Sequence, residues 1–165
     1  MKPPRDHVDQ VMEQWARERP DLDVSPQGVI GRLHRVAAAL TEELVEVYSR
    51  FGLGEGEFDV LATLRRSGAP YELTPTQLGL STMVSSGAIS KRVDRCVQQG
   101  WVSRRVAETD GRSRVVGLTD QGKRLIDEAF TAHIANEHRL VGKLSARQQD
   151  TLAAVLAVWG RTLGA

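Results

Sequence analysis

The sequence predicts a mainly α-helical protein that carries one small β-hairpin, and two observations support this fold class. First, apolar residues recur every three or four positions through most of the 165 residues, which is the spacing of amphipathic helices. Second, the segment from Thr74 to Thr119 contains, in succession, a short capped helix, a turn, a longer helix and two β-prone stretches joined by a turn signal.

The first third of the chain is predicted to form three helices. A helix over residues 7–19 carries one apolar stripe. Ser25 is expected to cap a second, long helix, with Pro26 at its first position and Gly52 at its end. A third helix is predicted over residues 55–66, with its large apolar side chains facing inward.

Two further helices are predicted on either side of a tight turn. Thr74 begins a capping box with Gln77, and Pro75 stands at the first helical position of a short helix that ends near Leu80. After the turn, a second helix is expected over residues 85–99. Two helices joined by a turn of about three or four residues form a helix-turn-helix pattern.

A β-hairpin is predicted directly after this pair of helices. Residues 102–107 and 114–118 are β-prone, and an Asp-Gly turn signal lies between them at 110–111. A hairpin in this position is a wing, so the fold class is a winged helix-turn-helix. Two more helices follow, the first capped by Thr119 and the second by Ser145.

The distribution of charge points to a polyanionic partner, although the net charge of +1 does not. Residues 85–115 contain seven Lys or Arg and three Asp or Glu, a net charge of +4, which leaves −3 for the rest of the chain. A basic segment on an otherwise acidic chain is an electrostatic footprint for nucleic acid, and the alternative is an ordinary solvated surface.

On a helical wheel, the helix over 85–99 separates into two faces. The apolar face consists of Ile89, Val93, Cys96 and Val97, and the opposite face of Gly87, Lys91, Asp94 and Arg95. A helix that enters the major groove needs one buried face and small or polar groups near its N-terminus. An arginine at a wing tip suits the narrow minor groove. The candidate DNA contacts are Thr74, Ser85, Ser86, Gly87, Ser90, Lys91, Arg95, Arg112 and Arg114.

Several classes of protein receive little support from the sequence. We find no nucleophile paired with a base, no phosphate-binding glycine loop and no metal-ligand spacing among the four histidines, so we expect neither an enzyme nor a bound cofactor or metal. No apolar run reaches the roughly 20 residues of a membrane helix, and no signal peptide is evident, so we expect a cytoplasmic protein with no membrane partner.

Taken together, these motifs resemble those of the multiple-antibiotic-resistance-regulator (MarR) family, over nearly the whole chain. The resemblance rests on the capped helix at Thr74, the Ser-Ser-Gly-Ala-Ile start at 85–89 and the Asp-Gly-Arg-Ser wing at 110–113. It implies a homodimeric transcription regulator that binds a double-stranded DNA operator. It also implies a single domain over 1–165, in which 6–52 and 119–165 supply dimerisation helices and 55–118 the DNA-binding region.

A narrower resemblance, to the urate-responsive branch of the family, implies a ligand site. It rests on an added N-terminal helix with Trp15 and on the segments 57–61, 71–75 and 85–88. The matching positions for a small anionic ligand, such as urate, xanthine or an organic acid, are Trp15, Asp59, Arg92 and Arg104. On the wheel, Arg92 lies at the border of the apolar face, where a carboxylate such as Asp59 would be its natural partner.

Three alternatives to this ligand-released repressor remain open at this point. Asp59 and Arg92 would form a purely structural ion pair, with Trp15 as plain core. Cys96, the one cysteine, would sense oxidants, although its place on the buried face argues against that. The same fold would also serve a DNA-binding protein that responds to no ligand.

Overall fold

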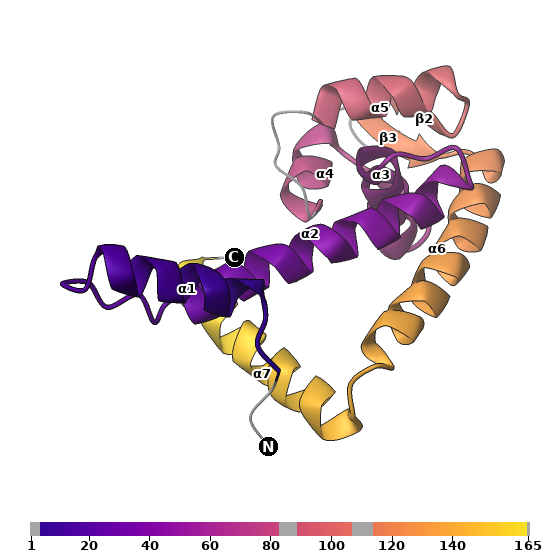
Figure 1. The fold of residues 1–165 in the computed structure, drawn as a ribbon. Helices are drawn as coiled ribbons and strands as arrows, with labels where there is room; N and C mark the ends of the chain where they lie inside the picture. The colour runs from indigo at the N-terminus through magenta and orange to yellow at the C-terminus, as the bar shows by residue number, and fades with distance from the viewer. Residues whose placement is uncertain (1–3, 83–88, 107–113, 165) are drawn as a thin grey trace. The chain divides into compact units, whose positions relative to one another are not determined.

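The computed structural model describes residues 4–82, 89–106 and 114–164. The chain divides into two compact units, residues 1–44 and 45–165, and each is described by itself. In chain order the elements are α1 (His7–Glu18), α2 (Gln27–Ser49), α3 (Glu55–Arg66), β1 (Glu72–Leu73), α4 (Pro75–Ser81), α5 (Ile89–Gln98), β2 (Val102–Val106), β3 (Arg114–Leu118), α6 (Asp120–Val141) and α7 (Ala146–Leu163) (Figure 1). The predicted class, mainly helical with a small antiparallel sheet, is confirmed.

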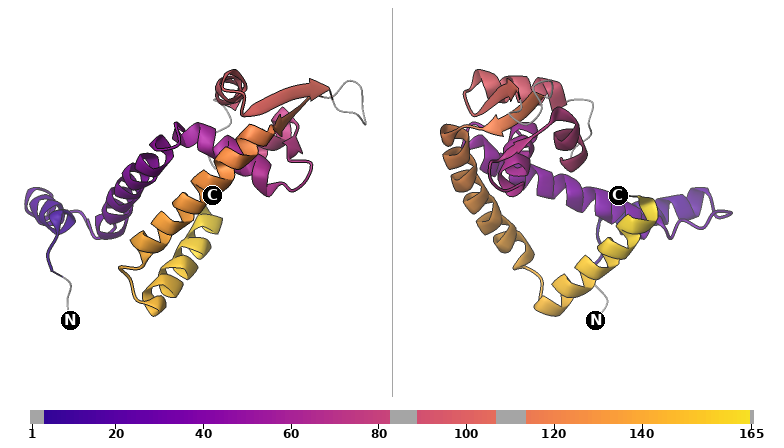
Figure 2. Two further views of the ribbon diagram at one scale, coloured as in Figure 1. Left: turned by 90° about the vertical axis from the view of Figure 1, so that its right-hand side faces the viewer. Right: turned by 180° about the vertical axis from the view of Figure 1, so that it is seen from behind.

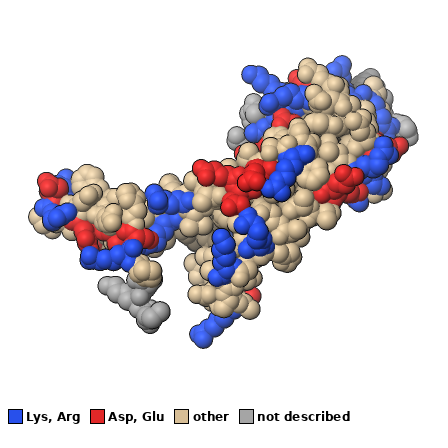
Figure 3. Space-filling view, turned by 45° about the vertical axis from the view of Figure 1, so that its right-hand side comes forward, with Lys and Arg blue, Asp and Glu red and all other residues tan. Residues whose placement is uncertain are grey.

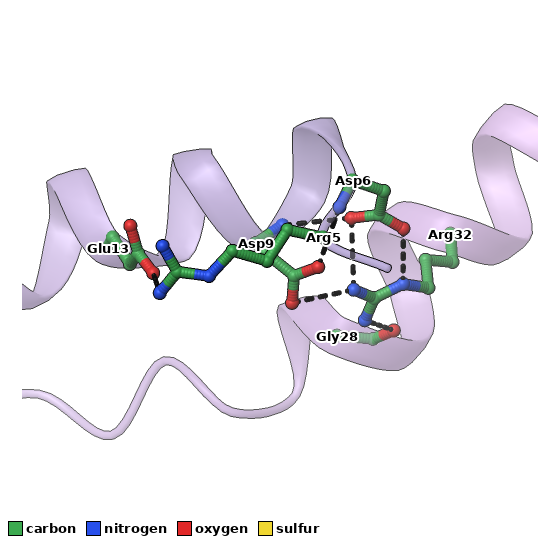
Figure 4. Close-up of polar contacts among 6 residues, drawn as sticks. All are labelled: Arg5, Asp6, Asp9, Glu13, Gly28 and Arg32. Carbon is green, nitrogen blue, oxygen red and sulfur yellow. Dashed lines mark hydrogen bonds and ion pairs between the residues drawn. The ribbon is translucent and has the colours of Figure 1, made fainter. Parts of the chain in front are cut away.

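In the first unit, α1 is held on the start of α2 by one arginine. Figure 4 shows Arg32 of α2 pointing toward the first turn of α1, where its guanidinium contacts Asp6 at 2.7 and 3.0 Å and Asp9 at 2.8 Å. The two aspartates also form the capping box that begins α1. The side chain of Val8 is buried and lies against Gly31, where a Cβ would be 3.3 Å from Val8 Cγ1.

The start of α2 differs from the expected Ser25 cap. Asp23 accepts hydrogen bonds from the backbone N–H of Ser25 at 2.9 Å and from its hydroxyl at 3.1 Å, so the Ser25 side chain faces back toward Asp23. The helix begins at Gln27, one residue after the predicted first position, Pro26. Asp23 therefore forms an Asx turn ahead of the helix, and the first N–H groups of α2 donate to backbone oxygens instead of a serine side chain, Gln27 N to Val24 O at 3.1 Å and Gly28 N to Ser25 O at 3.0 Å.

The core of the second unit is built around α3. Val60, Leu61 and Leu64 have no accessible surface, and α3 packs against α4, α5, α6 and β3. Leu78 from α4 and Ile126 from α6 are also fully buried. Each such side chain contributes about 1.5–3 kcal/mol relative to its exposed state, and this shared burial fixes α4 and α5 on one scaffold.

The sheet has three antiparallel strands in the order β1-β3-β2. The predicted hairpin is confirmed, with Val102 opposite Leu118 and Val106 opposite Arg114. The short strand β1 was not predicted, and it pairs Glu72 with Gly117 on the free edge of β3. The left view in Figure 2 shows β2 and β3 extending away from the neighbouring helices as a wing.

The last two helices are capped as the sequence predicted. Thr119 accepts a hydrogen bond from Gly122 N at 3.0 Å, and Ser145 forms a capping box with Gln148. Helix α6 contributes Ile126 and Ala129 to the core, whereas no residue of α7 is buried in the monomer. The exposed apolar side chains of α7 are Leu152, Val155, Leu156, Val158 and Leu163.

Candidate nucleic-acid interface

Helices α4 and α5 form the predicted helix-turn-helix pair. Thr74 caps α4 by accepting from Gln77 N at 3.2 Å, and Pro75 stands at the first helical position. Both helices contact α3 and each other. Because the pair is bound to the core through buried side chains, the opposite surface of α5 is free to meet a partner. The predicted contacts Ser85, Ser86 and Gly87 precede α5 and lie outside the described residues.

Within the described part of α5, the two predicted faces are confirmed with one exception. Ile89, Val93 and Cys96 are buried, whereas Val97 is 37% exposed. Ser90 and Lys91 are exposed, as a surface that meets DNA requires. The helix therefore presents small and cationic groups on one side while its apolar side holds it in place.

The side chains of two arginines of α5, Arg92 and Arg95, lie against the start of α3. The Arg92 side chain covers Gly56, where an added Cβ would lie 2.5 Å from Arg92 Nε, so only glycine leaves room for this packing. Arg95 Nε lies 3.0 Å from Glu57 Oε1. Asp59 stands three residues after Gly56, which places it on the same face of α3.

In the wing, Arg104 and Arg114 share the face of the sheet that is turned toward α5. This face carries the buried Val102 and Val116, and alternation along the strands places both arginines on it. They line a hollow of about 180 Å³ together with Pro75, Ile89, Ser90, Val93, Val115 and Val116. The Arg104 guanidinium is paired with Asp94 of α5 at 2.6 Å. The predicted contact Arg112 lies outside the described residues.

The opposite face of the wing carries a second ion pair. Arg105 of β2 donates to both carboxylate oxygens of Glu72 on β1, each at 2.7 Å. Neither Glu57 nor Glu72 was among the predicted site residues. For Glu57 the sequence did contain a signal, the Gly-x-x-Glu spacing from Gly54 to Glu57 that is typical of a helix start. A glutamate at that position points back toward the helix cap.

These ion pairs reduce the positive charge that the basic segment offers to a partner. Arg95, Arg104 and Arg105 each lie beside a carboxylate, two of which come from outside residues 85–115. Lys91 and Arg114 are the exposed basic residues of the described segment for which we find no ion pair in the described chain. Figure 3 accordingly shows acidic and basic side chains intermixed over the winged half of the molecule.

The four predicted ligand residues occupy different settings. Trp15 belongs to the first unit and is 47% exposed, whereas Asp59 in the second unit is 9% exposed. Arg92 is half-buried, and its Nη1 atom is buried with no hydrogen-bond acceptor among the described residues. Arg104 lies beside Asp94 on the wing side of α5. The predicted pairing of Asp59 with Arg92 stays a prediction.

The thiol of Cys96 is fully buried between α5 and the core. Burial, reinforced by the negative charge of Glu57, raises the pKa of the thiol to about 12. Among the described residues, no cluster of His, Cys, Asp or Glu is arranged to hold a metal ion. In the same residues, no helix is long and apolar enough to cross a membrane.

The helix-turn-helix on a shared core, followed by an antiparallel wing, defines a winged helix-turn-helix DNA-binding protein. Residues 51–113 match the model of the MarR family. The chain is 41% identical over 149 residues to the HTH-type transcriptional regulator PecS of Dickeya dadantii, covering 90% of each protein. It is 30% identical over 115 residues to the multiple antibiotic resistance protein MarR of Escherichia coli, covering 69% of this chain and 72% of that protein. The chain belongs to the MarR family of transcriptional regulators.

Solved structures agree with this assignment. The wild-type apo form of MarR from Escherichia coli matches with a TM-score of 0.63 and 29% identity, covering 77% of this chain and 93% of that chain. Sco3205 of Streptomyces coelicolor, a MarR family regulator crystallised with DNA, has the same fold, with a TM-score of 0.75 at 23% identity over 86% of this chain and 93% of its own. The family consists of DNA-binding regulators that are not enzymes, and dimerisation is typical of it.

Proposed function

We propose that this regulator is a homodimeric repressor that leaves its operator when a small weak acid binds near the recognition helix α5. DNA binding follows from the family and the fold. The ligand response is supported by one observation in particular, the buried Nη1 of Arg92, which lacks an acceptor among the described residues. A buried guanidinium donor without an acceptor is costly, and an anionic ligand would remove that cost.

The proposed ligand is a planar anion such as urate, xanthine or a related organic acid. Arg92 and Arg104 would supply its charge-assisted hydrogen bonds, and Trp15 and Asp59 are the further residues that the family resemblance assigns. Because Arg92 is packed on Gly56 of α3, a ligand that draws the Arg92 guanidinium away would disturb the packing of α5 on α3. A change of about 1.4 kcal/mol in differential binding would lower DNA affinity tenfold.

The proposed homodimer is supported by the surface of α7. A helix of 18 residues with no buried side chain and several exposed leucines and valines is unusual on a monomer. A two-fold dimer would cover this surface and would bind a pseudo-palindromic operator whose half-sites lie about one helical turn apart.

A mobility-shift titration on the DNA upstream of the chain's own gene tests the proposal. We expect one or more weak acids from a panel containing urate and xanthine to weaken the complex at least tenfold. Arg92→Gln and Trp15→Ala should remove this response, whereas Arg50→Gln, at an exposed arginine paired with Glu46, should keep it. If no acid weakens the complex, or if both site variants respond like the unmodified protein, the ligand proposal is wrong.

A thiol switch at Cys96 is the second candidate for regulation, and the buried, protonated thiol counts against it. A regulator that responds to no ligand is the third, and it is the outcome that a fully negative acid panel would favour. The titration therefore separates these three cases when it is repeated with peroxide in place of the acids.

A further inference from the structure

Glu57 lies at the junction of α3 and the recognition helix and contacts both. Its Oε2 atom accepts a hydrogen bond from Gly54 N at 3.1 Å, which completes the capping box at the start of α3. Its Oε1 atom lies 3.0 Å from Arg95 Nε on α5. We propose that Glu57 is an internal competitor of DNA phosphate: it holds Arg95 and thereby sets how strongly the regulator binds DNA.

The two partners of this ion pair have opposite exposures. The side chain of Glu57 is 11% exposed, whereas that of Arg95 is 65% exposed. The carboxylate is therefore fixed in the scaffold, and the guanidinium remains at the surface of the helix that meets DNA. An arginine in this position has two possible anionic partners, the carboxylate beneath it and a phosphate above it.

The contact between Glu57 and Arg95 is of a kind that Arg95 can exchange for a contact with another anion. Glu57 Oε1 is buried, yet it has no hydrogen bond among the described residues, so charge rather than hydrogen-bond geometry holds Arg95. The ion pair between Arg105 and Glu72 is different, because Arg105 donates two well-formed hydrogen bonds of 2.7 Å to the Glu72 carboxylate. A phosphate that offers Arg95 charge-assisted hydrogen bonds would compete well against a contact that lacks them.

Two consequences follow for DNA binding. While Glu57 is charged, Arg95 neutralises a phosphate only by giving up its ion pair, so the affinity is lower than the number of basic residues suggests. Neutralising Glu57 makes Arg95 available as an additional phosphate contact. Each phosphate contact steepens the slope of log affinity against log salt by about 0.9, so the loss of affinity between 50 and 200 mM salt grows by a further factor of about 3.5.

The variant that tests this is Glu57→Gln. The glutamine side chain keeps an oxygen that accepts from Gly54 N, since glutamine also serves in a capping box, while the negative charge is lost. The salt dependence of binding should be measured by fluorescence anisotropy on a mixed-sequence duplex of about 30 base pairs, because the phosphate contribution is independent of sequence. We expect tighter binding and a slope steeper by about 0.9 for each protomer bound.

The same substitution in an Arg95→Gln background decides whether Arg95 is responsible. We expect the double variant to have the slope of Arg95→Gln alone, because the phosphate contact that Glu57→Gln creates belongs to Arg95. If Glu57→Gln steepens the slope equally without Arg95, the effect is general charge repulsion and the proposal is wrong. An unchanged slope in the presence of Arg95 would also overturn it.

Glu55→Gln is the matched control. Glu55 is exposed in the same first turn of α3, so its substitution removes the same charge without touching Arg95. We expect its slope to equal that of the unmodified protein. Thermal unfolding of all four variants shows whether each is folded at the titration temperature, and only folded proteins enter the comparison.

Discussion

Glu72 on β1 and Arg105 on β2 form an ion pair across the intervening strand β3, with two hydrogen bonds of 2.7 Å. Gly117 of β3 makes this contact possible. A Cβ at that position would lie 2.8 Å from Glu72 Cγ, in the path of the glutamate side chain. The two edge strands of the sheet, β1 and β2, are thus connected over a glycine, which helps to fix the wing relative to the core.

Gly117→Ala should displace Glu72 from Arg105. We expect a loss of no more than about 1 kcal/mol in the free energy of unfolding, because the pair is partly exposed. Glu72→Gln should cause a similar loss, and the double variant should lose little more than either single variant, since both remove one interaction. Urea unfolding measures all three, and fully additive losses would show that Gly117 and Glu72 act independently.

Gly79→Ala is the control for the glycine substitution. Gly79 lies in α4, and a Cβ there meets nothing within 4 Å. We expect this variant to gain about 0.5–1 kcal/mol, because alanine favours the helix more than glycine does. A loss at Gly79 comparable to that at Gly117 would mean that glycine itself, rather than the path of Glu72, matters in this region.

Much of the fold could be predicted because local signals and burial agree. Residues 55–66 were predicted and found as one helix, since the spacing of Phe58, Leu61 and Leu64 matches the face that is buried. Thr74 was predicted and found as a helix cap because its capping box is formed within four residues. Signals of this kind do not depend on the rest of the chain.

The features that the sequence did not reveal depend on contacts distant in the chain. Strand β1 consists of Glu72 and Leu73 alone and exists because β3 offers a free edge. The partners of Arg95 and Arg105, Glu57 and Glu72, are separated from them by 38 and 33 residues along the chain. A helical wheel shows which residues point outward, but it does not show which of them a distant carboxylate neutralises.

Cys96 should be inert while the protein is folded. Its thiol is buried, and its pKa of about 12 leaves almost no thiolate near neutral pH. We expect Ellman's reagent to modify it no faster than the protein unfolds, and peroxide to leave DNA binding unchanged. Modification within seconds under native conditions, or a peroxide effect that Cys96→Ser removes, would restore the thiol switch as a mechanism.

Arg32→Gln should loosen α1 from α2 without unfolding the second unit. The guanidinium holds both aspartates at the start of α1, and this contact lowers the pKa of Asp6 to about 2. We expect faster hydrogen exchange in α1, by at least about tenfold, and little change in α3. Because the pKa of Asp6 is depressed, the contact should persist at neutral pH and weaken as the pH falls from about 4 toward 2.

Arg19→Gln is the matched control for Arg32. Arg19 pairs with Asp21, two residues away, and so connects no helix to another. We expect exchange in α1 to stay as in the unmodified protein. Equal loosening in both variants would indicate that loss of positive charge, rather than loss of the contact between helices, controls α1.

Tyr48 should make the stability of the protein depend on alkaline pH. Burial, together with the nearby charges of Glu137, Glu55 and Asp59, raises the pKa of the phenol from 10.0 to about 12. Between these values the folded protein keeps a proton that the unfolded chain loses, so stability falls as the pH rises from 10 to 12.

Tyr48→Phe tests this, because phenylalanine has no such proton, while its ring can keep the stack on Phe58, whose ring centroid lies 4.0 Å away. We therefore expect the free energy of unfolding of the unmodified protein, relative to Tyr48→Phe, to decrease between pH 9 and pH 11.5 in urea titrations. A difference that is constant over this range would mean that the phenol titrates normally in the folded protein.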